Sequence, residues 1–210
     1  MKILHVGATG LVGQQVLPRL LEAPGVSQVI APTRRLLEFQ HPRLLNPVVD
    51  FDVLPEEEAW WAVDAVICTL GTTLADAGSQ AAFRRVDHDY PLHVAQLARA
   101  RGARTYVLNS AMGASARSSI FYNRVKGELE DALAALGYPS LVLVRPGLID
   151  GERTQSRPGE ARMLAVSRWM RPMLPRKWRP SRVGHIADAL VGAALAPLPG
   201  ISVVEADRLA

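Results

Sequence analysis

Short apolar runs alternate along the chain with longer segments in which apolar residues recur at helical spacing. This alternation is typical of a parallel sheet whose strands are joined by crossover helices. It predicts an α/β protein with a doubly wound parallel sheet flanked by helices. We expect strands at residues 2–6, 27–32, 46–50, 64–68, 104–109, 140–145 and 201–205. We expect helices at residues 11–22, 80–101, 118–136, 158–170 and 184–196.

Length and composition indicate one domain. A chain of 210 residues can bury a substantial core, and 49% hydrophobic with 21% charged residues is ordinary for a globular protein. We therefore expect a single domain over residues 1–210. Its parts are a ligand-binding core (1–150), a basic segment (151–182) and a terminal helix and strand (183–210).

The single cysteine, Cys68, excludes an intrachain disulfide and lies in an apolar run, where a buried, inert thiol is expected. The first expected strand begins at residue 2, which leaves no room for a signal peptide. No apolar run approaches the roughly 18 residues that cross a bilayer. These features predict a soluble, cytoplasmic protein without a membrane span. Histidine and cysteine show no spacing typical of metal ligands, so no metal is expected.

Positive charge is concentrated in one segment, where nine basic residues face only Glu152 and Glu160. An anionic substrate, an acidic partner or a membrane surface would each suit such a segment. The simpler interpretation is a solvated substrate lid whose tryptophans pack into the core. Nucleic acid is not expected, because no recognised binding motif accompanies the charge. The basic residues are Arg153, Arg157, Arg162, Arg168, Arg171, Arg176, Lys177, Arg179 and Arg182.

The first expected strand runs directly into a glycine-rich turn, Gly7-Ala8-Thr9-Gly10-Leu11-Val12-Gly13. A turn of this kind directs the free N–H groups of the following helix at a bound anion. Gly7 permits the tight turn, Gly10 lets the backbone approach a pyrophosphate, and Gly13 allows close helix–strand packing. The motif therefore predicts a bound dinucleotide, NAD or NADP. The alternative is a glycine-rich turn without a ligand. The expected contacts come from Gly7, Thr9, Gly10, Leu11, Val12 and Gly13.

The end of the second expected strand predicts which dinucleotide is preferred. An acidic residue there would bond the 2′-hydroxyl of the adenosine ribose, whereas an arginine accommodates a 2′-phosphate. The chain has no acid at this place and carries Arg34 and Arg35. Because a guanidinium pairs well with phosphate, NADP(H) is favoured over NAD(H), which remains possible. The alternative is that both arginines are ordinary surface charges.

Two further strand ends meet the same edge of the sheet. Asp50 and Phe51 follow the third expected strand, where a carboxylate can accept a hydrogen bond from the adenine amino group; a plain turn residue is the alternative. Leu70, Gly71 and Thr72 follow the fourth, where small residues let the backbone approach the middle of the cofactor.

Tyr122 and Lys126 are four residues apart and lie on one face of an expected helix. A lysine ammonium beside a phenol stabilises the tyrosinate, so Tyr122 could act as an acid or base near neutral pH. Lys126 could also hold the nicotinamide ribose. Ser110 ends the fifth expected strand, and its hydroxyl could hold a substrate carbonyl or stabilise the tyrosinate. A tyrosine and a lysine at this spacing also occur by chance on solvated helices.

Together, these residues resemble the short-chain dehydrogenase/reductase superfamily, in its atypical or extended branch. More narrowly, they resemble the Tat-interacting-protein-like oxidoreductases, a small group that includes many bacterial proteins. The resemblance covers roughly residues 1–150. It rests on Asn109-Ser110-Ala111-Met112-Gly113-Ala114, Ser118-Ser119, Phe121-Tyr122-Asn123-Arg124-Val125-Lys126-Gly127-Glu128 and Val144-Arg145-Pro146-Gly147.

The resemblance implies a Rossmann fold with bound NADP(H) and catalytic roles for Ser110, Tyr122 and Lys126. It also implies that Arg145, Pro146 and Gly147 close over the nicotinamide end of the cofactor. Classical members carry an asparagine where this chain reads Val86-Asp87-His88-Asp89, so a proton relay through that asparagine is not assumed. About sixty residues follow Asp150, too few for the sugar-nucleotide region of extended members.

We therefore expect an NADP(H)-dependent oxidoreductase that acts on a small carbonyl or hydroxyl compound. Two alternatives stay open. One is a regulatory protein in which NADP(H) binding sets a conformation that a protein partner recognises. The other is an isomerase or dehydratase with tightly held NAD(P). The protein could be a monomer or a homodimer paired through its long helices.

Overall fold

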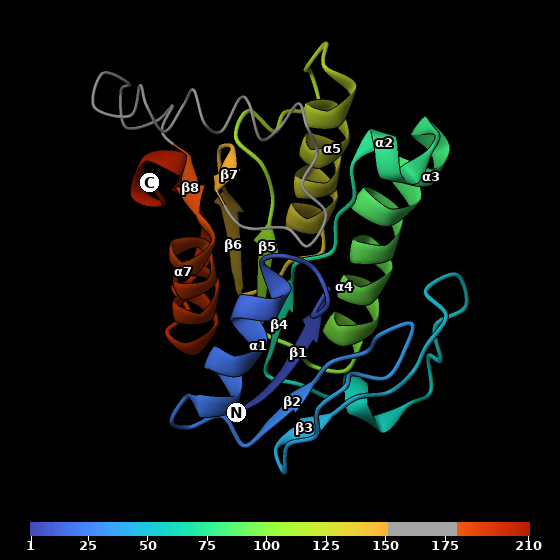
Figure 1. Cartoon of the computed structure of the whole chain (residues 1–210), viewed down its shortest axis with the longest axis vertical. Helices are drawn as coiled ribbons and strands as arrows, with labels where there is room; N and C mark the ends of the chain where they lie inside the picture. Colours follow the sequence, from blue (N-terminus) through green and yellow to red (C-terminus); the bar gives the residue numbers. More distant parts are fainter. Residues whose placement is uncertain (151–179) are drawn as a thin grey trace.

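Seven parallel strands form one twisted sheet at the centre of the computed structural model, which describes residues 1–150 and 180–210 (Figure 1). The strand order is β3-β2-β1-β4-β5-β6-β9. This confirms the expected Rossmann-like, doubly wound sheet. The strands are β1 (Lys2–Val6), β2 (Gln28–Ile30), β3 (Leu44–Leu45), β4 (Ala65–Cys68), β5 (Thr105–Asn109), β6 (Ser140–Arg145) and β9 (Gly200–Glu205).

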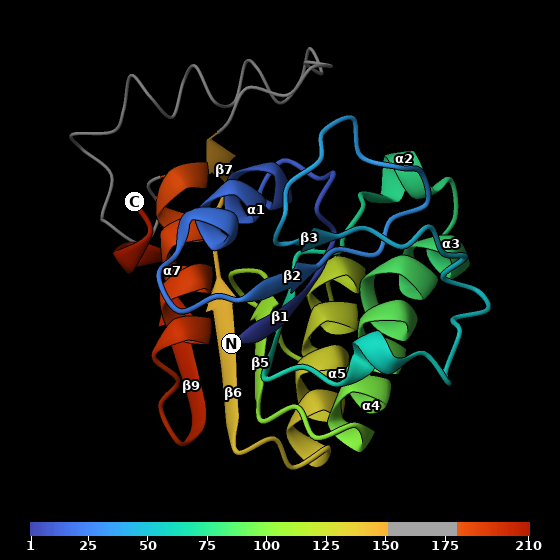
Figure 2. The ribbon, with the colours of Figure 1, turned by 90° about the horizontal axis from the view of Figure 1, so that it is seen from below.

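Helices cover both faces of the sheet, as the two perpendicular views show (Figures 1 and 2). Helices α1 (Gly13–Glu22) and α7 (Val183–Leu195) cover one face, while α4 (Tyr90–Ala100) and α5 (Phe121–Ala135) cover the other. The shorter helices α2 (Leu74–Ala77) and α3 (Gln80–Arg84) precede α4. Single 3₁₀ turns lie at Ala59–Trp61 and Ala206–Arg208.

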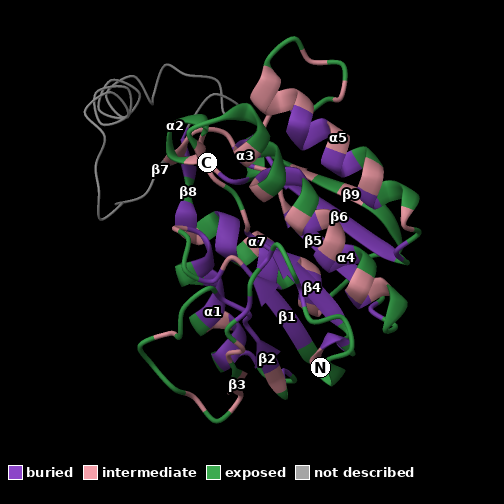
Figure 3. Ribbon diagram, turned by 90° about the vertical axis from the view of Figure 1, so that its right-hand side faces the viewer, coloured by how far each residue is buried: buried purple, intermediate pink, exposed green. Residues whose placement is uncertain are grey.

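Side chains alternate between two apolar cores because successive residues of a strand point to opposite faces of the sheet. In β1, Ile3 packs with α1 and α7, whereas Leu4 packs with α4 and α5. Both faces of the central strands are buried, which explains why their sequences are continuous apolar runs (Figure 3).

The strand order reverses between β1 and β4, and ligands of such sheets bind outside the carboxyl ends of the strands at this point. Most of the residues that the sequence singled out follow β1, β2, β3, β4, β5 or β6, while Tyr122 and Lys126 lie on α5 (Phe121–Ala135). The fold therefore brings these segments to one edge of the sheet.

Three expected elements differ from the structure. The strand expected at residues 46–50 is the two-residue β3, followed by a single bridge between Thr33 and Val48. The helix expected at 80–101 is interrupted by a π-helical turn, Arg85–Asp89. The helix expected at 158–170 and most of the basic segment lie outside the described residues.

The structure also contains a small two-stranded sheet that the sequence did not predict. It pairs β7 (Ile149–Asp150) with β8 (Ser181–Arg182) in parallel. In the described part of the chain, we find no helix with the length and apolar character that a bilayer crossing requires.

Candidate functional site

The glycine-rich turn connects β1 to α1 and is tightly packed at two of its three glycines. A Cβ on Gly13 would lie 2.0 Å from the carbonyl oxygen of Gly7. Gly7 has a φ of 92°, and a Cβ there would lie 2.5 Å from the backbone of Thr69. Gly10 differs, because a Cβ there would meet only the Gly7 oxygen, at 3.4 Å. The backbone at Gly10 is exposed and open to a ligand, as the dinucleotide motif requires.

The neighbouring residues of the turn divide between core and ligand side. The side chain of Val12 is buried in the core, so only its backbone is available to a phosphate. Thr9 is exposed, and its carbonyl oxygen accepts a hydrogen bond from the Gln14 amide at 3.1 Å. Leu11 is half-buried against the α1–α7 side of the core.

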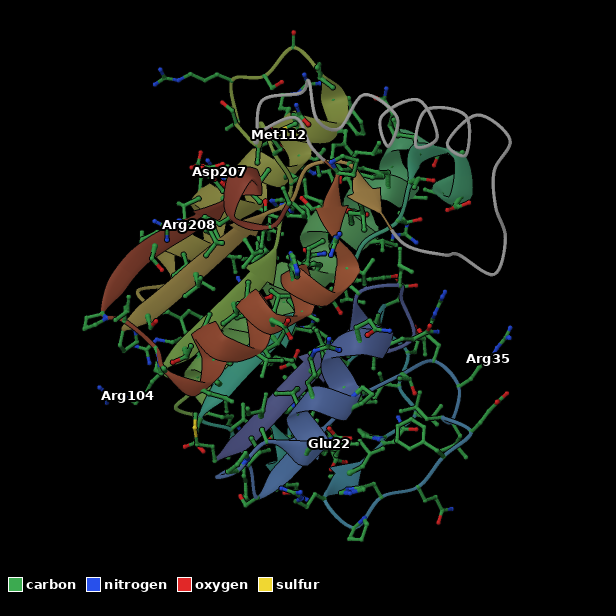
Figure 4. The ribbon with its side chains drawn as sticks, turned by 60° about the vertical axis from the view of Figure 1, so that its left-hand side comes forward. Glu22, Arg35, Arg104, Met112, Asp207 and Arg208 are labelled. Atoms are coloured by element: carbon green, nitrogen blue, oxygen red, sulfur yellow. The ribbon has the colours of Figure 1, made fainter. Side chains whose placement is uncertain are left out.

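A groove of about 740 Å³ lies between the glycine-rich turn and the loop after β2. Arg34 and Arg35 line it and are exposed; within the described residues, neither guanidinium has an ion-pair partner. Figure 4 shows the Arg35 side chain reaching outward from this loop. Glu38 lines the same groove, so the two arginines and this glutamate give the groove a net charge of +1. The remaining lining residues are Ala8, Thr9, Gln14, Leu17, Pro18, Leu36, Leu37 and Phe39.

Asp50 and Phe51 lie beyond the bridge that follows β3. Asp50 is exposed, and its Oδ1 accepts a hydrogen bond from the Asp52 N–H at 2.9 Å. Phe51 is buried, with its ring 5.6 Å from that of Tyr90 between centroids. Asp50 therefore retains acceptor capacity toward solvent, whereas Phe51 is engaged in packing.

The loop after β4 is held against the helix layer by a single carboxylate. Asp87 Oδ2 accepts a hydrogen bond from the Thr72 N–H at 2.7 Å. A Cβ on Gly71 would lie 3.3 Å from Asp87 Oδ1 and 3.7 Å from Lys126 Nζ. Gly71 and Thr72 therefore lie close to the Lys126–Asp87 pair.

Lys126 and Asp87 form a buried ion pair, with 2.7 Å between Nζ and Oδ1. Their side chains are only 4% and 1% exposed. Burial lowers the pKa of Lys126, but the charge of Asp87 and the neighbouring Tyr122 outweigh it, so the pKa stays above its usual value. Lys126 is therefore a fixed ammonium at neutral pH.

Tyr122 lies one helical turn before Lys126 on α5 and is half-buried. Its ring contacts that of the buried Phe83, with 5.5 Å between centroids. The aromatic contact orients the phenol, while the next turn of the helix carries the ammonium. This arrangement suits a tyrosine that donates or accepts a proton beside a fixed positive charge.

Ser110 is engaged by a carboxylate on α5. Its buried hydroxyl donates a hydrogen bond to Glu130 Oε1 at 2.6 Å. Glu130 is one turn beyond Lys126 on α5 and also accepts two hydrogen bonds from Arg145, at 3.1 and 2.5 Å. The structure thus joins Ser110 to the Glu130 carboxylate and, through it, to Arg145.

Arg145 is also held by carboxylates. Its guanidinium binds Glu130 and, at 3.3 Å, Glu205 at the end of β9. These carboxylates raise the pKa of Arg145, chiefly through the hydrogen bonds with Glu130. The guanidinium is therefore committed to joining α5, β6 and β9. Only the backbone that follows it is left for the role over the cofactor.

That backbone is itself anchored on both sides. The Pro146 carbonyl accepts a hydrogen bond from the Met112 N–H at 2.8 Å, and the Gly147 N–H donates to Ser181 Oγ at 3.0 Å. Asn109, at the end of β5, has a buried Oδ1 without a hydrogen-bond partner among the described residues.

Sequence reasoning missed Asp87, Glu130 and Asn109 as parts of the site. Asp87 was noted only as a departure from the asparagine of classical members. Pro91 was the available signal, since it lacks the N–H that an α-helix would give to the Asp87 carbonyl, and so favours the π-helical turn that carries Asp87. Glu130 follows Lys126 at helical spacing, but that spacing alone does not distinguish a buried carboxylate from a solvated one.

Comparison with known proteins identifies a family. A family model described as NAD(P)H-binding matches residues 7–163. A mitochondrial protein named fmp52 from Emericella nidulans is 38% identical over 163 residues, which are 74% of this chain and 70% of the relative. The protein of the same name from Aspergillus clavatus is 34% identical over 211 residues, covering 96% of this chain and 88% of the relative.

Solved structures agree on the fold. A putative NAD-dependent epimerase/dehydratase from Bacillus halodurans has a TM-score of 0.69 at 17% identity, covering 99% of this chain and 97% of that one. The protein MoeE5, in complex with UDP-glucose and NAD, has a TM-score of 0.73 at 17% identity, covering 97% of this chain and 75% of that one.

These findings correct two expectations. The cytoplasmic location is wrong, because the matching relatives are named mitochondrial proteins. These relatives are also fungal, whereas the resemblance led us to expect bacterial ones.

Proposed function

This chain belongs to the NAD(P)H-binding family, and we propose that it is an NADP(H)-dependent oxidoreductase acting on a small carbonyl or hydroxyl compound. The observation that carries the proposal is that one sheet edge has an open glycine-rich turn, a basic groove, and a half-buried Tyr122 one helical turn before the buried Lys126–Asp87 ion pair. The narrower likeness to Tat-interacting-protein-like oxidoreductases is part of the same proposal.

The residues present fit the dinucleotide. The open side of Gly10 and the N-terminus of α1 suit the pyrophosphate, since free N–H groups there favour an anion. Arg34 and Arg35, unpaired within the described residues, suit a 2′-phosphate, and their two charges exceed that of Glu38. Asp50 would accept from the adenine, and Leu70, Gly71 and Thr72 would lie along the middle of the cofactor.

When bound, the cofactor supplies the hydride that reduces the carbonyl carbon. Tyr122 donates its phenolic proton to the carbonyl oxygen, so the alcohol forms and a tyrosinate is left. The Lys126 ammonium stabilises that negative charge and binds the ribose hydroxyls. Ser110 supports the site indirectly, by fixing Glu130 one turn beyond Lys126.

The test is calorimetric titration of the cofactor-free protein with NADPH and with NADH. We expect NADPH to bind at least about tenfold more tightly, because each guanidinium–phosphate pair is a charge-assisted hydrogen bond. The Arg34→Ala/Arg35→Ala variant should lose this preference and keep its NADH affinity. Arg104→Ala is the matched control, since Arg104 is exposed just before β5, at the amino end of the strands (Figure 4).

Binding of neither dinucleotide would refute the oxidoreductase proposal. Equal affinity for both would leave the oxidoreductase in place and remove the preference for NADP(H). Release of tightly held NAD(P) from the purified protein, with activity that needs no added reductant, would favour an isomerase or dehydratase.

A further inference from the structure

Asp87 joins different parts of the site through one ion pair and one hydrogen bond. Its Oδ1 lies 2.7 Å from the ammonium of Lys126 on α5, and its Oδ2 accepts from the Thr72 N–H after β4 at 2.7 Å. The carboxylate thus joins the helix that carries Tyr122 to the loop on the cofactor side. The position of the Asp87 side chain is well defined, because Asp87 is completely buried and lies in the π-helical turn between α3 and α4.

A buried carboxylate needs a reason to remain charged. Removing an ion from water is costly, and an isolated buried carboxylate would take up a proton. Asp87 is compensated by Lys126 and by a backbone donor, while Lys126 has no other carboxylate within ion-pair distance among the described residues. Each charge therefore depends on the other. Loss of either partner leaves an uncompensated ion beside Gly71, where the cofactor is proposed to lie.

We propose that Asp87 is the positioning residue of this site, holding the Lys126 ammonium and the Thr72 backbone in one arrangement so that Lys126 can bind the cofactor and support Tyr122. The inference rests on the proposed function for its consequence, but the hold of Asp87 on Lys126 can be measured without any cofactor. Asp87 acts through Lys126 and is not itself placed in contact with substrate.

The first measurement is the titration of Lys126 in the cofactor-free protein, followed by NMR of lysine labelled at Cε. The chain has three lysines, Lys2, Lys126 and Lys177, so few signals need assignment. The groups that act on Lys126 are Asp87 from the π-helical turn, Tyr122 from α5 and Cys68 from β4. In the parent protein, we expect Lys126 to titrate above the usual pKa of a lysine, because the charge of Asp87 outweighs burial.

In Asp87→Asn, the pKa of Lys126 should fall below its usual value, because burial then acts without the opposing carboxylate. Asp89→Asn is the matched control: it lies in the same π-helical turn, is largely exposed and pairs with His88. An unchanged Lys126 titration in Asp87→Asn, or an equal change in Asp89→Asn, would overturn the proposal.

The second measurement is a double-mutant cycle on NADPH affinity, using Asp87→Asn, Lys126→Met and both together. Asp87→Asn should weaken NADPH binding about tenfold in the parent background and have no further weakening effect beside Lys126→Met. The same loss in both backgrounds would mean that Asp87 acts independently of Lys126, which contradicts the proposal.

The double variant also guards against failure to fold. It removes both charges, and replacing a buried ion pair by uncharged groups is often neutral for stability. If Asp87→Asn alone does not fold but the double variant does, the dependence of one charge on the other is supported. If the parent protein binds no NADPH, the proposed function fails, while the Lys126 titration still decides whether Asp87 holds Lys126.

Discussion

Ser110 and Tyr122, which the sequence groups together, make different contacts in the structure. Ser110 donates to Glu130, which Arg145 also binds, whereas Tyr122 lies beside Phe83 and one turn before Lys126. The spacing of Tyr122 and Lys126 was readable from the sequence, because helical periodicity alone places them on one face. The partner of Ser110 was not, since it depends on how α5 lies on β5 and β6.

Because Ser110 and Tyr122 have different partners, we predict different consequences for two conservative substitutions, Tyr122→Phe and Ser110→Ala. Tyr122→Phe should lower turnover at least about a hundredfold with NADPH affinity unchanged, because a general acid is lost. Ser110→Ala should keep turnover within about fivefold and lower the free energy of unfolding by about 1–2 kcal/mol, because a buried hydrogen bond is lost. The measurements are NADPH oxidation across a panel of small carbonyl compounds and denaturant unfolding.

Two results would contradict this assignment. If Ser110→Ala abolished turnover at unchanged stability, the serine would have the catalytic role that the resemblance implies. If no carbonyl compound oxidised NADPH although the cofactor bound, the regulatory alternative would replace the oxidoreductase.

At the scale of elements, glycines in the glycine-rich turn serve two purposes, close packing and an open backbone, and the sequence does not show which glycine serves which. Gly13 is required by packing, since a Cβ there would lie 2.0 Å from the Gly7 carbonyl. Gly10 faces open space apart from a 3.4 Å contact with the same oxygen, and its backbone needs no left-handed conformation. The motif predicted the turn, but only the structure distinguishes the glycine that is tightly packed from the glycine whose surroundings are open.

Alanine substitutions should separate these two demands. Gly13→Ala should lower the free energy of unfolding by about 3 kcal/mol or more, because backbone must move to admit the methyl group. Gly10→Ala should change stability by less than about 1 kcal/mol yet weaken NADPH binding at least tenfold, because the methyl group occupies the approach to the pyrophosphate. Thermal unfolding and calorimetric titration of both variants test this, and normal NADPH affinity in Gly10→Ala would contradict it.

At the scale of the whole molecule, the sequence predicted a doubly wound parallel sheet, but not the length of every strand or the buried polar contacts between elements. The apolar runs that become β1, β4, β5 and β6 are continuous because both faces of these strands are buried. The strand predicted at residues 46–50 is instead the shorter β3, which ends at Leu45. It ends there because the Asn46 side chain donates hydrogen bonds to Ala31 and Thr33, and Pro47 has no N–H to donate. The buried pairing of Asp87 with Lys126 arises only when the β4 loop, the π-helical turn and α5 converge.

The same burial makes global stability depend on pH through His5. This side chain is completely buried in β1, with Nε2 3.1 Å from Thr69 Oγ1, and burial lowers the pKa of His5 from 6.5 to about 3. Between these values the unfolded chain binds a proton that the folded protein does not, so stability is full above pH 6.5 and falls as the pH is lowered toward 3. The expected loss from His5 between pH 7 and pH 4.5 is about 2.5 kcal/mol. Denaturant unfolding at both pH values should show this extra loss in the parent and in His185→Gln, whose histidine is exposed, and not in His5→Gln. Equal losses in the parent and His5→Gln would mean that carboxyl groups alone determine the acid sensitivity.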